Sequence, residues 1–208
     1  MKKLLLVGAV ALFGAMNAQT EKGSWVIGGS TTLGFNSLNT TYKYQGQSTD
    51  GPKVSTITIT PSVGYFVIDK LAIGLDLGFT SITKKEEEVY MNTTYTYKNT
   101  ISTFSVLPTA TYYFKSGSNV LPYLGVGIGY SSSKTKDSSS ASSNTSEESI
   151  GGFAWKAKGG VTFLLSPSIG LDLGLSYMAN YGKLDSNQDV KVNTGTLGVN
   201  AGISVFLK

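Results

Sequence analysis

The hexapeptide Ile-Gly-Leu-Asp-Leu-Gly occurs twice in the chain, at Ile73–Gly78 and again at Ile169–Gly174. Around each copy every second residue is apolar, and the residues between are small or polar, with Asp76 or Asp172 in the middle. A period of two is typical of a β-strand with two unlike faces. The twin stretches therefore predict two similar strands, each with one apolar face and one polar face that carries an acid.

The same alternation occurs in eight segments of the chain. They lie at about Ser24–Asn36, Ser55–Phe66, Leu71–Thr80, Ile101–Phe114, Leu121–Ser131, Gly152–Leu164, Ile169–Tyr177 and Thr194–Leu207. Short turns near Ile68–Lys70, Lys115–Asn119 and Ser166–Ser168 alternate with long polar connections, for which we expect loops, at about Leu38–Lys53, Lys84–Asn99, Ser132–Ile150 and Gly182–Val192. Alternating short and long connections are typical of an up-and-down antiparallel meander.

Two of these segments contain a proline, Pro61 and Pro108. A proline cannot donate a hydrogen bond to the neighbouring strand, which central strands rarely tolerate. We keep both strands and expect a bulge or a strand end near each proline.

The apolar face of all eight segments lacks charged residues, and it carries several aromatic side chains. The polar face is built mainly of Gly, Ser, Thr and Asn, with only Asp76, Lys156, Lys158 and Asp172 charged. A soluble barrel would turn this nearly uncharged face toward water, whereas a narrow polar lumen fits it well. The predicted fold is therefore all-β, an eight-stranded antiparallel up-and-down transmembrane β-barrel.

The N-terminus predicts export. Residues 1–18 have the basic start, apolar stretch and small residues of a signal peptide, and we expect residues 19–208 to form a single barrel domain. Loss of Lys2 and Lys3 lowers the formal charge from +4 to +2, too near neutral to indicate nucleic-acid binding. The chain contains neither Cys nor His, the usual ligands of zinc and haem, and we expect no metal or cofactor.

A family resemblance rests on two adjoining strands. Leu121–Tyr130, Leu-Pro-Tyr-Leu-Gly-Val-Gly-Ile-Gly-Tyr, resembles a characteristic strand of small bacterial outer-membrane barrels, and Phe104–Phe114 resembles the strand before it. The group is that of the OmpA transmembrane domain, OmpX and OmpW-like proteins of the Bacteroidetes type. The resemblance implies a monomer in the outer membrane, in contact with lipid, lipopolysaccharide and the assembly machinery. One departure is the C-terminus, which ends in Leu207-Lys208 and not in an aromatic residue.

The missing His argues against an enzyme, because outer-membrane barrel enzymes rely on His as a general base. We expect Asp76, Asp172, Lys156 and Lys158 to face one another in the lumen. They would form either an internal salt-bridge plug or, as the sharper alternative, a gate for ions or small solutes.

The long connections are the remaining candidates for binding an extracellular ligand. Tyr90, Tyr95 and Tyr97, set among small polar residues, are candidate contacts. The expected function is a structural or surface-adhesion role with long extracellular loops. The alternative is a narrow channel for ions or for small polar or hydrophobic solutes.

Overall fold

The computed structural model describes residues 20–31, 36–44, 47–90, 93–114, 119–140, 142–186 and 191–208. They form nine strands: β1 (Trp25–Thr31), β2 (Asn36–Tyr44), β3 (Gln47–Ile68), β4 (Leu71–Tyr90), β5 (Thr93–Tyr113), β6 (Val120–Ser139), β7 (Ser142–Ser166), β8 (Ile169–Leu184) and β9 (Lys191–Leu207). Within these ranges, the structure has no helix that is long and apolar enough to cross a membrane.

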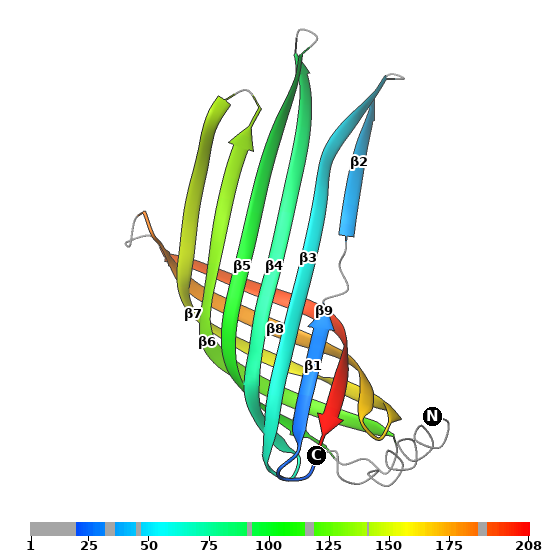
Figure 1. The fold of residues 1–208 in the computed structure, drawn as a ribbon. Coiled ribbons are helices and arrows are strands. Elements are labelled where there is room, and N and C mark those ends of the chain that lie inside the picture. Colours follow the sequence, from blue (N-terminus) through cyan, green and yellow to red (C-terminus); the bar gives the residue numbers. More distant parts are fainter. Residues whose placement is uncertain are drawn as a thin grey trace, which may run out of the picture.

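The strands form a closed antiparallel barrel with eight strand positions (Figure 1). Each strand from β3 to β9 pairs with its neighbours along the chain, and β1 closes the ring by pairing with both β9 and β3. β1 and β2 pair with successive parts of β3, so together they occupy the first strand position of the barrel. The predicted eight-stranded up-and-down barrel is confirmed.

The apolar face of the barrel points outward. Large side chains on alternate positions of the strands are exposed, from Ile73 and Phe104 to Leu124 at 59% and Leu197 at 75% exposure. The alternate positions point into the barrel and are small or polar, such as Ser105 and Thr111, which are buried. This arrangement is typical of a membrane barrel with a lipid-facing band. We call the band of exposed apolar side chains the lipid belt.

Six strands continue far beyond this belt. Figure 1 shows β2 to β7 rising above the level at which β8 and β9 end. The last pair between β7 and β8 at this end is Ile150 with Leu184, so residues 142–149 of β7 lie above it. We call the part of β2 to β7 beyond the belt the wall (residues 36–44, 47–57, 81–90, 93–102, 132–139 and 142–151).

The prediction of long loops at 38–53, 84–99 and 132–150 is therefore wrong for the described residues, which belong mostly to the strands of the wall. Both faces of these segments are polar, so no apolar alternation marks them as strands. They are held instead by main-chain pairing and by cross-strand side-chain contacts, such as Asn99 Nδ2 to Asp137 Oδ1 at 2.6 Å and Lys134 Nζ to Glu147 Oε2 at 2.5 Å. The fourth connection is shorter than expected, because β8 runs to Leu184 and β9 starts at Lys191.

The bulges expected at the two prolines are absent. Pro61 still pairs with Gly29 on β1, and Pro108 still pairs with Leu75 on β4. Pairing is skipped on only one side of each, toward β4 at Pro61 and toward β6 at Pro108, and the register is the same before and after the gap. One absent N–H interrupts the ladder to one neighbour only, so the strand continues through it.

Candidate functional site

The lumen is closed by apolar side chains near the short turns. Phe66, Tyr113 and Phe206 project inward from β3, β5 and β9, and their exposed fractions are 0%, 7% and 3%. The ring centroids lie 5.6 Å apart for Phe66 and Tyr113, and 5.9 Å apart for Tyr113 and Phe206. Val26, Ala72 and Leu121 complete this cluster. We call these six residues the aromatic plug.

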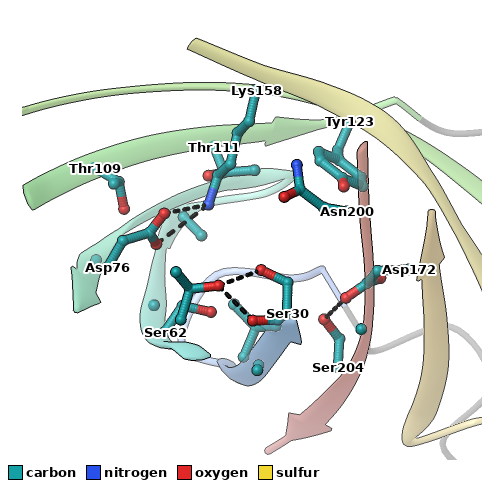
Figure 2. A pocket seen from close by; sticks show the side chains of 18 of the residues that line it. Ser30, Ser62, Asp76, Thr109, Thr111, Tyr123, Lys158, Asp172, Asn200 and Ser204 are labelled. Atoms are coloured by element: carbon teal, nitrogen blue, oxygen red, sulfur yellow. Dashed lines mark hydrogen bonds and ion pairs between the residues drawn. The ribbon is translucent and has the colours of Figure 1, made fainter. Parts of the chain in front are cut away.

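The lumen also contains a charge cluster, of which Figure 2 shows Asp76 and Lys158. Asp76 on β4 accepts hydrogen bonds from two ammonium groups of β7. Lys156 Nζ lies 3.2 Å from Oδ2, and Lys158 Nζ lies 3.2 Å from Oδ1 and 3.1 Å from Oδ2. The Asp76 side chain is only 7% exposed, so this ion pair lies largely out of water.

The long side chain of Lys158 needs the space left by a glycine. Gly125 lies directly opposite Lys158 in the register of β6 and β7. A Cβ on Gly125 would lie 2.9 Å from the Lys158 Cε atom and 2.8 Å from the Thr111 hydroxyl oxygen. The glycine-rich alternation of β6 therefore provides the room through which Lys158 reaches Asp76.

Asp172 does not join this ion pair. Its carboxylate accepts hydrogen bonds from the Thr162 and Ser204 hydroxyls on the neighbouring strands β7 and β9. Of the four charged residues expected to face one another, the structure brings Asp76, Lys156 and Lys158 together and places Asp172 among hydroxyl groups. Asp172 lines the same cavity, but hydroxyl groups satisfy it in place of ammonium groups.

The two acids border a polar cavity of about 70 Å³. Its other lining groups include hydroxyls and an amide, as Figure 2 shows for Ser30, Ser62, Thr109 and Asn200. A cavity of this size and polarity has room for a few water molecules. The aromatic plug lies between this cavity and the short turns, so this polar chamber is closed on the side of the short turns.

A second site lies on the inner face of the wall. Two adjoining cross-strand rows form it, and both follow from the register of β4 to β7. One row contains Lys84, Asn99, Asp137 and Ser146, and the next contains Glu86, Tyr97 and Ser139. These residues line an open groove, together with Lys98, Ser138 and Thr145, which lie next to them along the strands and have the outward parity. We call it the wall groove.

The wall groove is polar, and its inward charged groups have partners within it. Lys84 Nζ pairs with Glu86 Oε1 at 2.7 Å, and Asp137 accepts a hydrogen bond from the Asn99 amide. The inward charged side chains of its lining are Lys84, Glu86 and Asp137, so the groove has a small net negative charge. Tyr97 is 41% exposed and presents its ring to this surface.

The structure places the three candidate tyrosines differently relative to the wall groove. Tyr97 lines the wall groove, and Tyr95 lies two residues before it in β5, on the same face by strand alternation. Tyr90 ends β4, and its side chain lies outside the described residues.

Sequence reasoning missed the aromatic plug and the wall groove. For the plug a signal existed, since Phe66, Tyr113 and Phe206 are the bulky residues on the lumen parity next to strand ends. The wall groove depends on cross-strand register, which no single strand reveals. Within the described residues, no three His, Cys, Asp or Glu side chains lie close enough together to hold a metal ion.

Comparison with known proteins identifies the family. A comparison with curated proteins finds no match. Among solved structures, the chain is similar to Neisserial surface protein A at 19% identity and a TM-score of 0.47, covering 88% of this chain and 97% of that one. It is similar to OprG from Pseudomonas aeruginosa at 14% identity and a TM-score of 0.48, covering 90% of this chain and 97% of that one. It is also similar to the attachment invasion locus protein of Yersinia pestis, Ail, at 18% identity and a TM-score of 0.42, covering 87% of this chain and 99% of that one.

The family model for the outer membrane protein beta-barrel domain matches residues 4–203, nearly the whole chain. The chain therefore belongs to the outer membrane protein beta-barrel domain family and lies in the outer membrane.

Proposed function

We propose that the protein is a non-enzymatic surface anchor, in which a closed barrel holds the wall groove above the membrane to bind an extracellular ligand. The observation that carries this proposal is the groove itself, built from two in-register rows of polar side chains on β4 to β7. A surface made by regular strands is held more firmly than one made by loops, which favours defined binding.

The chemistry of the groove favours a polar ligand with little net charge. Tyr97 offers a flat ring and a hydroxyl, while Asn99 and Asp137 offer hydrogen-bonding groups beside it. Aromatic and small polar side chains are the usual composition of adaptable binding surfaces. Because Lys84 is paired with Glu86 and Asp137 accepts a hydrogen bond from Asn99, the groove offers little unpaired charge, and a carbohydrate chain fits better than a strongly charged polymer.

The lumen supports an anchor more than a channel. The aromatic plug fills the lumen beside the short turns, and the Asp76 ion pairs join β4 to β7 across its interior. Both features favour a rigid, closed barrel. The polar chamber of about 70 Å³ is the feature that favours the channel alternative, which requires displacement of the plug.

Binding by the groove can be tested with bacterial cells that display the full chain, probed on arrays of neutral and charged glycans. The double variant Tyr97→Ala, Asn99→Ala is expected to lose most of the binding. The matched control is Thr100→Ala, Ser102→Ala, on the opposite face of the same strand, which is expected to bind normally. Equal binding by both variants would refute a role for the groove.

The closed barrel is tested by planar-bilayer recording of the purified chain. We expect no reproducible current steps from the unmodified protein. Steady conductance would favour the channel alternative and count against a purely anchoring barrel.

A further inference from the structure

The charged residues of the wall and of the rim beside it are sorted by face. Seven lysines on the outward parity of their strands lie beyond the lipid belt: Lys53, Lys85, Lys98, Lys134, Lys136, Lys183 and Lys191. The described acids with that parity in the same strands are Glu87 and Glu147. The inner parity has the reverse balance, with Lys84 against Glu86, Asp137 and Glu148. We call the seven outward lysines the basic collar.

Lysines of the collar stand directly beside one another. Lys85 is paired in register with Lys53 on one side and with Lys98 on the other. Lys183 is paired in the same way with Lys191 on the other side of the barrel. Like charges directly opposite on neighbouring strands destabilise a sheet unless another group neutralises them.

The acids of the outward face neutralise only part of this charge. Lys85 Nζ pairs with Glu87 Oε1 at 2.6 Å. The Glu147 carboxylate pairs with two lysines, with Lys134 Nζ at 2.5 Å from Oε2 and Lys136 Nζ at 3.3 Å from Oε1. In the described part of the chain, Lys53, Lys98, Lys183 and Lys191 form no ion pair with a carboxylate. The collar therefore keeps a large excess of positive charge, and it faces sideways from the barrel.

The height of the collar places it beside lipid headgroups. On β8, Lys183 comes two residues after Tyr181, an exposed aromatic of the lipid belt. On β6, Lys134 comes four residues after Tyr130, a rise of roughly 10 Å for a tilted strand. Lys85 comes six residues after Phe79, a rise of roughly 15 Å. Long lysine side chains bend back toward the interface, which brings the ammonium groups into the polar layer.

The geometry points to the basic collar as a binding site for the phosphate groups of anionic lipid in the outer leaflet, such as lipopolysaccharide. Phosphate oxygens accept hydrogen bonds from several ammonium groups at once and remove the repulsion between neighbouring lysines. The site faces the same direction as the lipid belt, so its ligand is a membrane lipid. This inference requires the outer-membrane location and does not depend on the wall groove.

Retention of lipid by the full chain tests the collar. Protein in nanodiscs of phosphatidylcholine with bisphosphorylated lipid A is extracted and weighed by native mass spectrometry. Parallel samples contain enzymatically dephosphorylated lipid A. We expect at least fivefold greater retention of the phosphorylated lipid, and we expect Lys53→Gln, Lys85→Gln, Lys98→Gln to abolish this preference. A triple variant with Arg at these positions should keep it.

The matched control is Lys84→Gln, which removes a lysine from the inner face of the same strand, and we expect it to retain the lipid normally. Equal retention of both lipids by the unmodified chain, or an unaltered preference in the triple Gln variant, would overturn the proposal. So would displacement of the lipid by inorganic phosphate at equal concentration, because the collar would then be a site for free anions. Loss of glycan binding in the groove variant leaves this readout unchanged, so the two proposals fail separately.

Discussion

Lys158 on β7 reaches Asp76 on β4, and its Nζ atom lies within hydrogen-bonding distance of both carboxylate oxygens, at 3.2 and 3.1 Å. β5 and β6 separate the two strands in the sheet, so the contact spans the interior of the barrel. With Lys156 on the same carboxylate, two cations share one anion that is almost fully buried in the lumen.

Loss of this anion should destabilise the barrel strongly. Asp76→Asn leaves two largely buried ammonium groups without a counter-charge, which costs about 3–5 kcal/mol. Asp172→Asn is the matched comparison, since its partners are hydroxyls, and its cost should be about 1 kcal/mol. Denaturant unfolding in lipid vesicles measures both. Unchanged stability in Asp76→Asn would show that the charge cluster does not stabilise the barrel.

Removal of the aromatic plug should open a path through the barrel. In Phe66→Ala, Phe206→Ala, two buried rings disappear from the centre of the plug, and each loss costs about 3–5 kcal/mol in a packed core. We expect lower stability together with current steps in planar bilayers. Val67→Ala alters the neighbouring, lipid-facing position of β3, and we expect it to show no current steps. If the double variant folds but shows no current steps, residues elsewhere in the lumen must block the passage of ions.

Acidic pH should strengthen lipid binding at the basic collar. Hydrogen bonds and charge from Lys134 and Lys136 hold the pKa of Glu147 below its ordinary value of 4.5. The ion pairs are therefore complete above pH 4.5 and are lost as the pH falls through this lowered pKa, which frees both lysines. Glu147→Gln should reproduce the acidic state at pH 7, with more phosphorylated lipid retained. Glu148→Gln, on the inner face, is the control; equal gains in both variants would contradict the role of the outward face.

One glycine of the first hexapeptide should resist any side chain. A Cβ on Gly74 would collide with the main-chain oxygen of Val63 and lie 2.8 Å from the Gly64 Cα atom, so the backbone of β3 or β4 must move. Gly74→Ala should cost about 1–3 kcal/mol, as overpacking usually does. A Cβ on Gly29 would meet no described atom within 4 Å, and Gly29→Ala should be nearly neutral. Thermal unfolding in detergent separates the two cases, and equal midpoints would contradict this steric argument.

The barrel could be predicted because lipid contact imposes alternation on each strand. Leu124, Val126 and Ile128 interleave with three glycines, and this pattern alone specifies both the strand and its outward face. The wall could not be predicted in the same way. Residues such as Thr96, Lys98 and Thr100 alternate with other polar side chains, so the sequence contains no period that distinguishes a strand from a loop.

The interior was predicted in part, for a related reason. The acids and lysines of the lumen are recognisable as rare charges on a small, polar face. Whether Asp172 meets a lysine or two hydroxyls depends on which residues of β7 and β9 lie beside it. Thr162 and Ser204 hold that position because of the strand register, which is set by the turns and by packing around the whole ring.

The height of the wall has a consequence for how the protein sits in its membrane. Lys85, Glu87 and Lys98 lie beyond the belt on strands that are continuous with it. Turning the barrel over would draw these charges through hydrocarbon, where a lysine at the midplane costs about 2–4 kcal/mol. The charges of six strands would have to cross together. After the polar ends of the wall have crossed the bilayer during assembly, the cost of moving their charges back through hydrocarbon therefore fixes the orientation of the barrel.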